Sequence, residues 1–243
     1  MKPLIIIPAR MASTRLPGKP LADIGGAPMI VRCAQRAQAA DLGPVYIACC
    51  ETEVEQAVTA SGYHAVMTDP DLPSGTDRIK SALEQIDPDE KFDTIINVQG
   101  DLPTLDPAIL QTAISLMDNP NVDIATLAVA TRDPDDIANP NVVKAVIAFD
   151  TDTTGRALYF TRASAPSSDG PVYHHVGLYV YRRAALTAFC DLPPSPLEQR
   201  ERLEQLRALE AGMRIDVALI DHAPHGVDTP ADLERARAQY KIK

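Results

Sequence analysis

The sequence predicts an α/β fold built on a mostly parallel, twisted sheet with flanking helices. In the first half of the chain, short apolar segments alternate with amphipathic ones, and strands separated by single helices run parallel with right-handed crossovers. In the second half, strand-like segments follow one another with little room for helices, which favours antiparallel pairing. The 243 residues contain no repeat and no low-complexity linker. We therefore expect a single domain over residues 1–243 that includes a strand-rich insertion.

The first half contains three clear strand candidates and a weaker one. Residues 4–7 and 45–49 are apolar throughout and residues 94–98 are mostly apolar, as expected for buried parallel strands. Residues 64–67 form the weaker candidate. Ligands of such sheets bind beyond the carboxyl ends of the strands, so the segments that follow these strands are the first place to look for a site.

Helix-start signals lie between these strands. Thr52 and Glu55 form a T-x-x-E capping box, and Ser74 stands three residues before Asp77. Asp106 precedes a proline, the residue preferred in the first helical turn. Each signal introduces an apolar stripe with helical spacing, so we expect three helices.

The second half begins with four strand candidates, at residues 124–130, 142–149, 157–161 and 175–181. A further strand is expected at residues 215–220.

Two helices are expected near these later strands. Ser195 and Glu198 form a capping box, followed by an apolar stripe at Leu203, Leu206 and Leu209. Gly212 then favours the end of that helix. After the last strand, a threonine at position 229 caps a final helix.

Positive charge gathers at the start of an acidic chain. Lys2, Arg10, Arg15 and Lys19 lie within residues 1–22, which contain no acid. The total formal charge is −10, so the other residues carry −14. Nucleic-acid binding requires a basic surface, so this distribution excludes it and favours a small anionic ligand.

The basic segment follows the first buried strand, where a phosphate-rich ligand is expected. Arginine offers a rigid fork of donors and lysine a mobile point charge. The segment matches neither the G-x-x-x-x-G-K-[ST] P-loop nor the G-x-G-x-x-G dinucleotide motif. The alternative is a solvated basic turn, but its prolines stiffen the loop and reduce the entropy lost on binding.

Two aspartates are candidates for a magnesium site. Asp101 follows the strand at 94–98 through a glycine, and Mg²⁺ is usually held by one or two carboxylates together with substrate phosphates. Asp228, just before the final helix, is the natural second ligand. Both have plain structural alternatives: Asp101 as a turn or cap residue and Asp228 as a helix N-terminal charge.

Other polar residues give weaker signals. Ser74, Gly75 and Arg78 stand at a helix start, where backbone and hydroxyl donors can contact an anion. His175 and Tyr179 share one face of a strand and suit a small polar ligand, although a satisfied core histidine is an equal alternative.

The sequence lacks the motifs that are typical of several other classes of protein. No serine–histidine–acid or cysteine–histidine arrangement is apparent, so covalent catalysis is not expected. No apolar run reaches the length of a membrane span, and no signal peptide is apparent. The four cysteines have no metal-ligand spacing, which indicates free thiols in a reducing cytoplasm.

The chain closely resembles the 3-deoxy-manno-octulosonate (Kdo) cytidylyltransferases. The resemblance spans nearly the whole chain and rests on these segments, in order: PARMASTRLPGKPL, SGTDR, NVQGD, ALYFTRA, HHVGLY, SPLEQRERLEQLR and GVDTP. The first segment also fits the sialic-acid cytidylyltransferases, whereas the later ones favour the Kdo branch.

This resemblance implies a nucleotide-diphospho-sugar transferase fold with a small antiparallel dimerisation element near residues 130–190, and a cytoplasmic homodimer. It implies a Mg²⁺-dependent nucleotidyltransferase that makes CMP-Kdo for lipopolysaccharide biosynthesis. The anomeric hydroxyl of Kdo attacks the α-phosphorus of CTP and pyrophosphate leaves, without a covalent enzyme intermediate.

The resemblance also implies roles for individual residues. The catalytic residues are Asp101, Asp228, Lys19 and Arg10, and the two aspartates hold the metal. CTP is bound by Arg10, Arg15, Lys19, Ser74, Gly75 and Arg78. The sugar acid is bound by Gln99, Arg162, His175, Tyr179, Glu204 and Gln205.

Two positions depart from the family pattern. Leu102 replaces an acid or amide after Asp101 and cannot accept a hydrogen bond, and His174 replaces a lysine or arginine. A related acceptor, such as sialic acid or 8-amino-Kdo, is therefore an alternative substrate. A non-catalytic CTP-sensing protein is the alternative from another class. An NDP-sugar pyrophosphorylase would need a glycine-rich loop after the first strand, which this chain lacks.

Overall fold

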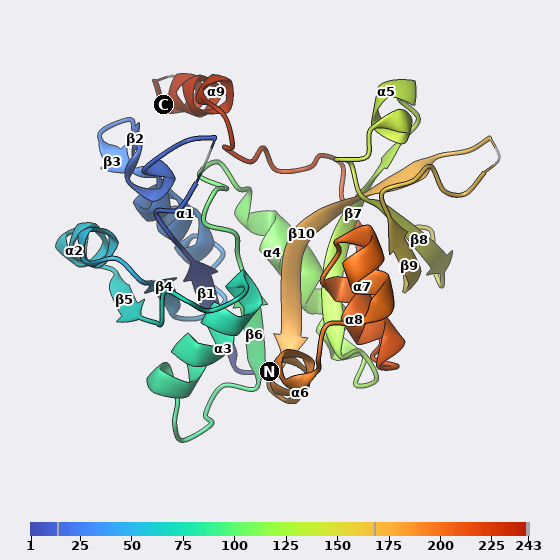
Figure 1. Cartoon of the computed structure of the whole chain (residues 1–243), viewed down its shortest axis with the longest axis horizontal. Helices are drawn as coiled ribbons and strands as arrows, with labels where there is room; N and C mark the ends of the chain where they lie inside the picture. The colour runs from blue at the N-terminus through green and yellow to red at the C-terminus, as the bar shows by residue number, and fades with distance from the viewer. Residues whose placement is uncertain (14, 168, 242–243) are drawn as a thin grey trace. The chain divides into compact units, whose positions relative to one another are not determined.

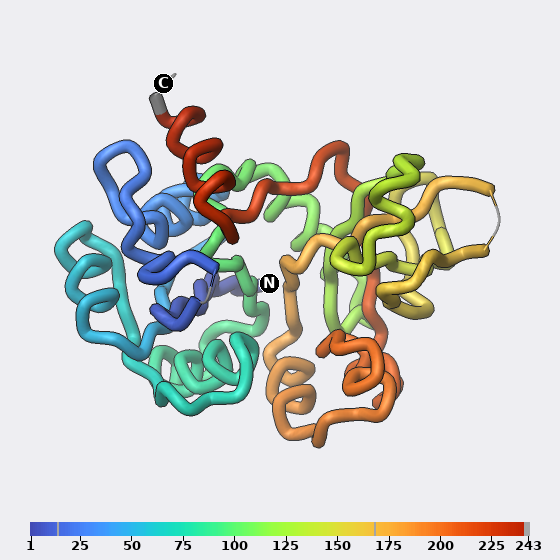
Figure 2. Tube along the Cα trace, turned by 45° about the horizontal axis from the view of Figure 1, so that its top comes forward, coloured from blue at the N-terminus to red at the C-terminus, as the bar shows by residue number. Residues whose placement is uncertain are grey.

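The computed structural model describes residues 1–13, 15–167 and 169–241, and it divides the chain into two compact units. The first unit comprises residues 1–111 and 224–243, and the second comprises residues 112–223 (Figures 1 and 2). Residues 130–190, where the strand-rich insertion is expected, lie inside the second unit. Among the described residues, no helix has the length and apolar character needed to cross a bilayer.

The first unit is built on four parallel strands, which confirms the strands predicted in the first half. In spatial order they are β5 (His64–Met67), β4 (Val45–Cys49), β1 (Pro3–Pro8) and β6 (Thr94–Asn97). The four central residues of β1 are fully buried, as its continuous apolar run predicts.

The helices α1 (Met29–Gln38), α2 (Thr52–Ala60) and α3 (Gly75–Ile86) pack on these strands. Ser74 caps α3 as predicted, accepting a hydrogen bond from the Asp77 amide. The Thr52 capping box is wrong: Thr52 is already helical and Glu51 occupies the cap position without a side-chain cap bond. The chain therefore enters α2 one residue earlier than the motif indicates.

Short elements complete the first unit. They are the 3-10 turn η1 (Lys19–Leu21), the hairpin strands β2 (Asp23–Ile24) and β3 (Ala27–Pro28), and the C-terminal helix α9 (Pro230–Lys241). Although α9 ends the described chain, it lies beside β2 near the beginning (Figures 1 and 2). Helix α4 (Pro107–Ser115) spans the sequence position at which the units change.

The second unit contains five mostly antiparallel strands, as predicted. In order they are β10 (Val172–Arg182), β7 (Ile124–Thr131), β11 (Ile215–Leu219), β9 (Thr154–Thr161) and β8 (Lys144–Phe149). Only β11 and β7, among the described pairs in this unit, run parallel. The start of β10 also pairs with β8, so the pairings close into a ring.

The helices of the second unit are η2 (Leu116–Asp118), α5 (Pro134–Ala138), α6 (Arg183–Asp191), α7 (Pro196–Glu201) and α8 (Gln205–Glu210). The Ser195 capping box is confirmed. The single long helix predicted after it is wrong, because Arg202 adopts a left-handed conformation and divides the segment. The leucine stripe therefore spans a kink: Leu203 is buried in the break and Leu206 in α8.

Candidate active site at the carboxyl edge of the first sheet

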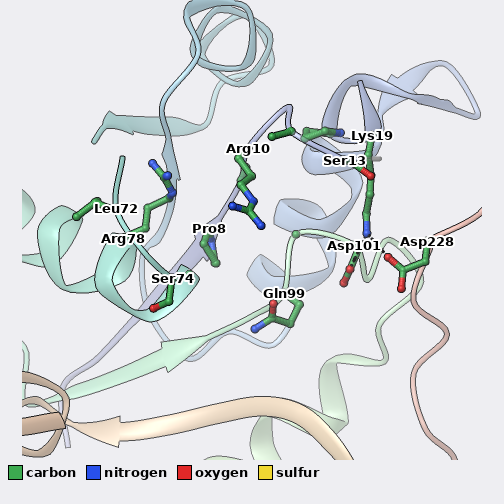
Figure 3. A pocket seen from close by; sticks show the side chains of 15 residues that line it. Pro8, Arg10, Ser13, Lys19, Leu72, Ser74, Arg78, Gln99, Asp101 and Asp228 are labelled. Atoms are coloured by element: carbon green, nitrogen blue, oxygen red, sulfur yellow. Dashed lines mark hydrogen bonds and ion pairs between the residues drawn. The ribbon is translucent and has the colours of Figure 1, made fainter. Parts of the chain in front are cut away.

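A cavity of about 340 Å³ opens beyond the carboxyl ends of β1 and β6, within the first unit (Figure 3). This volume lies in the range of small-molecule sites. The cavity is lined by Pro8, Ala9, Arg10, Ala12, Ser13, Lys19, Pro20, Leu72, Ser74, Gly75, Arg78, Gln99, Gly100, Asp101 and Asp228. Parallel strands bring their carboxyl ends to one edge, so segments far apart in sequence meet here.

A glycine allows two strand ends to approach closely. A side-chain carbon at Gly100 would lie 2.7 Å from the Pro8 carbonyl oxygen, closer than real atoms of this kind come. The chain that leaves β6 can therefore pass against the end of β1 only because position 100 has no side chain. This approach places Asp101 beside the basic loop that follows Pro8.

Lys19 joins the two aspartates that the sequence nominates. Its ammonium nitrogen lies 2.8 Å from Asp101 Oδ2 and 2.8 Å from Asp228 Oδ1 (Figure 3). Arg15 adds an ion pair of 3.0 Å to the other oxygen of Asp228. The structure brings Asp101 and Asp228 together beside the cationic turn, and their binding of a common metal ion stays a prediction.

The electrostatics of this cluster keep Lys19 charged. Burial by itself would lower the pKa of Lys19, but attraction and hydrogen bonds from Asp101 and Asp228 outweigh it, so the pKa rises above its ordinary value. The Lys19 side chain is 14% exposed, whereas those of Asp101 and Asp228 are 30% and 46% exposed. Both carboxylates thus remain open to a ligand from the cavity side.

The two carboxylates suit a divalent cation. Both already direct an oxygen at a single positive centre, the Lys19 ammonium. Carboxylate oxygens are hard donors, and Mg²⁺ needs only one or two of them when substrate phosphates and waters supply the rest. Within the described residues, no cluster of three or more His, Cys, Asp or Glu side chains could hold a metal ion. A metal held by Asp101 and Asp228 would therefore complete its coordination with oxygens of substrate or water.

Helix α3 presents its N-terminus to the cavity. Ser74 and Gly75 line the cavity at the start of this 12-residue helix, where backbone N–H groups favour an anion. Arg78 lines it too, but its side chain is buried and donates to the Thr68 hydroxyl and the Asp69 carbonyl. Arg78 therefore holds the loop before α3 in place, and its contact with a nucleotide stays a prediction.

Arg10 and Gln99 complete the predicted part of the cavity. The exposed Arg10 side chain extends into it from the end of β1, and Gln99 lies beyond the end of β6 (Figure 3). The Gln99 amide nitrogen donates to Asn97 Oδ1 at 3.1 Å. Arg15 does not line the cavity and reaches the cluster only through Asp228.

Two further residues shape the site without any motif to mark them. Leu72 lines the cavity from the loop between β5 and α3. Glu51 accepts a hydrogen bond of 2.9 Å from the Met11 amide and so anchors the basic loop. The sequence indicates these two residues only by their place in the chain, because both follow the carboxyl ends of predicted parallel strands.

The other sugar-acid candidates lie in the second unit, and Arg162 is engaged there in backbone contacts. Its Nε donates to the Glu201 carbonyl at 2.9 Å, and its two other nitrogens donate to the Pro140 and Arg202 carbonyls. The Glu201 carboxylate accepts from the Arg162 amide at 2.9 Å. Three of the five guanidinium N–H groups are therefore used, two of them on carbonyls at the end of α7 and one on the Pro140 carbonyl before β8.

His175 and Tyr179 lie together, as predicted, with ring centroids 5.5 Å apart. A bulge between Val176 and Tyr179 interrupts the strand register without separating the rings. His175 Nε2 lies 3.0 Å from the Thr126 hydroxyl, whose single proton faces the carbonyls of residues 176 and 178. The histidine therefore donates to Thr126, and this satisfied contact matches the core-histidine alternative.

The last two candidates lie where α7 gives way to α8. Glu204 is the N-cap residue of α8 and is partly exposed, and Gln205 is the first residue of α8 and is buried. Leu102, which departs from the family pattern, is buried beside Asp101. His174 is partly exposed, and burial lowers its pKa.

Comparison with known proteins places the chain in a family. Residues 4–215 match the family model described as cytidylyltransferase. The 3-deoxy-manno-octulosonate cytidylyltransferase of Parvibaculum lavamentivorans is 61% identical over 236 residues, which cover 97% of this chain and 92% of that protein.

Two solved structures are also similar. One is a CMP:2-keto-3-deoxy-manno-octonic acid synthetase complexed with CTP, which is 40% identical with a TM-score of 0.91 and covers 100% of this chain and 99% of that one. A cytidylyltransferase from Leptospira borgpetersenii is 16% identical with a TM-score of 0.65, covers 100% of this chain and 88% of that one, and shares the fold.

Proposed function

The chain belongs to the 3-deoxy-manno-octulosonate cytidylyltransferases, and on this premise we propose how its residues carry out the reaction. The enzyme transfers CMP from CTP to Kdo, giving CMP-Kdo and pyrophosphate for lipopolysaccharide biosynthesis. The observation that carries the proposal is the Lys19 ammonium held between Asp101 and Asp228 at the edge of the cavity. Cationic and acidic groups side by side are what a nucleoside triphosphate and its metal require.

Asp101 and Asp228 would hold the divalent cation, which we propose to be Mg²⁺. When bound, Mg²⁺ neutralises charge on the phosphate oxygens. Without the metal, the Lys19 ammonium occupies the position between the two carboxylates and supplies the positive charge there. Once another cation reaches the carboxylates, the ammonium is available to the triphosphate.

The basic loop and α3 bind the nucleotide. Arg10 and Lys19 face the cavity and bind phosphate oxygens, while Arg15, which is paired with Asp228, adds positive charge from the exposed side. The N-terminus of α3, at Ser74 and Gly75, adds backbone donors.

The reaction is a direct displacement. The anomeric hydroxyl oxygen of Kdo forms a bond to the α-phosphorus of CTP as the bond from that phosphorus to the β-bridging oxygen breaks. Pyrophosphate takes the electron pair of that bond, and the hydroxyl proton is released to solvent. The side chains contribute positioning and charge stabilisation, with no covalent step on the protein.

The sugar-acid subsite is proposed from the family resemblance. Gln99 contributes from the first unit, and the second unit contributes Arg162, His175, Tyr179, Glu204 and Gln205. We also propose that the enzyme is a cytoplasmic homodimer, which light scattering coupled to size exclusion tests.

The decisive experiment measures pyrophosphate release with CTP, Mg²⁺ and Kdo, in parallel with sialic acid and 8-amino-Kdo. Turnover with Kdo at least tenfold faster than with either analogue supports the proposal. Normal CTP binding without release for any acid would favour the non-catalytic alternative. Preference for an analogue would keep the reaction class and reassign the acceptor. Omission of Mg²⁺ and its replacement by Mn²⁺ test the metal.

A further inference from the structure

We propose that Asp232 and Tyr240 of α9 are positioning residues for the metal site, so that docking of this helix sets the affinity for the divalent cation. The inference rests on the proposed roles of Asp101 and Asp228. Neither Asp232 nor Tyr240 lies in the basic loop or contacts the Lys19 ammonium.

The start of α9 holds the segment that carries Asp228. Asp232 Oδ2 accepts hydrogen bonds from the Asp228 amide at 3.2 Å and from the Thr229 amide at 2.9 Å. It also accepts from the Thr229 hydroxyl at 2.7 Å, and the Asp232 amide donates back to that hydroxyl. One carboxylate thus fixes the backbone of Asp228 on the helix that follows it.

The same segment is joined to the backbone of the other acid. The amide of Val227 donates to the Asp101 carbonyl at 2.9 Å. The two metal-binding candidates are therefore linked by main chain as well as through Lys19. A shift of the Asp228 segment would change the separation between the two carboxylates.

The far end of α9 is anchored to the segment that follows Asp101. The Tyr240 hydroxyl donates to the Pro103 carbonyl at 2.6 Å. The Arg32 guanidinium stacks over the Tyr240 ring, 4.5 Å from its centroid, and Arg32 Nε donates to the Ile24 carbonyl.

The hairpin turn beside the helix is shaped to receive this tyrosine. Gly25 has a φ of +60°, and a side-chain carbon there would lie 3.0 Å from Tyr240 Cβ. A larger residue at position 25 would strain the turn and push the helix away. The close approach therefore holds the end of α9 against the β2–β3 hairpin.

Together these contacts hold the Asp101 segment at two points, one in the loop that leads into α9 and one near the end of α9. Val227 binds it just before α9 begins, and Tyr240 binds it two residues after Asp101, near the helix end. A helix is stiff along its axis, so loosening either anchor changes the geometry of both carboxylates. Groups that orient metal ligands typically change metal affinity by about 10- to 100-fold when they are removed.

The test measures the affinity for Mn²⁺ in the presence of saturating CTP, from the paramagnetic resonance signal of free Mn²⁺. Asp232→Ala should weaken Mn²⁺ binding by about 10- to 100-fold. Tyr240→Phe, which keeps the ring and loses one hydrogen bond, should weaken it by about 5-fold. Asp232→Asn keeps an acceptor oxygen and should restore most of the affinity lost in Asp232→Ala.

Glu234→Ala is the matched control, because it removes an exposed ion pair with Arg237 on the same helix. Glu234→Ala should leave the Mn²⁺ affinity unchanged. All of these variants should leave the KM of the sugar acid unchanged. If Asp232→Ala lowers only the melting temperature and Mn²⁺ affinity is unchanged, Asp232 is an ordinary helix cap and the inference is wrong. If the wild-type enzyme with CTP binds no Mn²⁺, the metal site itself is wrong.

Discussion

Asp101 and Asp228 are bridged by one ammonium group, because Lys19 Nζ lies 2.8 Å from an oxygen of each. Two carboxylates that face one point repel each other unless a cation stands between them. In this structure the cation is a side chain, and during the reaction it is proposed to be a metal bound with the triphosphate. On this proposal the metal ion would replace the Lys19 ammonium between the two carboxylates.

Replacement of Lys19 should reveal this exchange. Lys19→Met keeps the side-chain length but leaves Asp101 and Asp228 without their shared cation, so Mg²⁺ alone should bind more tightly than in the wild type. We expect Mg²⁺ without nucleotide to raise the melting temperature of the variant by several degrees more than that of the wild type. The measurement is a thermal shift titration.

Lys19→Arg serves as the control, since it keeps the charge and should respond as the wild type does. The same Lys19→Met enzyme should bind CTP more weakly, because a phosphate contact is lost. An equal Mg²⁺ response in wild type and Lys19→Met would show that lysine and metal do not share the carboxylates.

Loss of either acid should reduce the chemical step more than nucleotide binding. Asp101→Asn or Asp228→Asn should lower kcat by about 10²- to 10³-fold, the effect of removing one well-placed electrostatic group. The double variant should be little worse than either single one, because both act on one cation. Steady-state pyrophosphate release measures kcat, and calorimetry measures the CTP affinity.

Asp89→Asn provides the matched control, since Asp89 forms an exposed ion pair with Lys91 in the same unit. Its kcat should equal that of the wild type. Fully additive losses in the double variant would indicate that Asp101 and Asp228 act independently, against a shared metal.

Glu201 should matter for the stability of the second unit. Its carboxylate accepts from the Arg162 amide and from the Thr161 hydroxyl, and the latter distance is 2.8 Å. Glu201→Ala leaves these donors without an acceptor and should reduce the free energy of unfolding by about 1–3 kcal/mol. Urea denaturation measures the loss.

The partly exposed Glu204, three residues on, is the comparison site for the Glu201 variant. Glu204→Gln should cost less stability than Glu201→Ala but raise the KM of the sugar acid, if Glu204 contacts that substrate. A raised KM in Glu201→Ala without any loss of stability would instead place Glu201 itself in the acceptor subsite.

Local sequence patterns predict those helices and strands whose formation depends on a single local feature. The buried strands follow from continuous apolar runs, and Ser74 and Ser195 are caps because their hydroxyls meet an amide three residues on. The capping box predicted at Thr52 is wrong because Glu51 is the N-cap residue, so Thr52 is already the first residue of the helix. The leucine spacing does not signal the break at Arg202, where the residue is left-handed and its carbonyl accepts a hydrogen bond from the distant Arg162 side chain.

The site was predictable where residue type alone determines the chemistry. Asp101 after a buried strand and Asp228 before a helix are predicted metal ligands; the structure brings both carboxylates to the Lys19 ammonium, and metal binding stays a prediction. The spacing of residues in the sequence does not predict that Lys19 lies between the two carboxylates, nor that α9 contacts the segments that carry them. The Arg162 guanidinium, expected in a substrate pocket, is largely engaged with backbone carbonyls, a contact between segments distant in sequence.

Acid should destabilise the enzyme through His175. Burial lowers the pKa of His175 to about 3, with a smaller contribution from His174, whereas an unfolded histidine titrates near about 6.5. Between these values the unfolded chain binds the extra proton, so stability is present at neutral pH and is lost as pH falls. Acidification from pH 7 to pH 5 should remove on the order of 2 kcal/mol through this residue.

The test compares urea unfolding of the wild type and His175→Gln at both pH values. Glutamine cannot be protonated but offers an N–H group to Thr126, so the variant should lose about 2 kcal/mol less on acidification. His64→Gln is the control, because it makes the same substitution at an exposed histidine of the first unit. Equal losses in wild type and His175→Gln would mean that His175 is charged in the folded enzyme. Its position would then favour contact with an anionic substrate over a role as a neutral core residue.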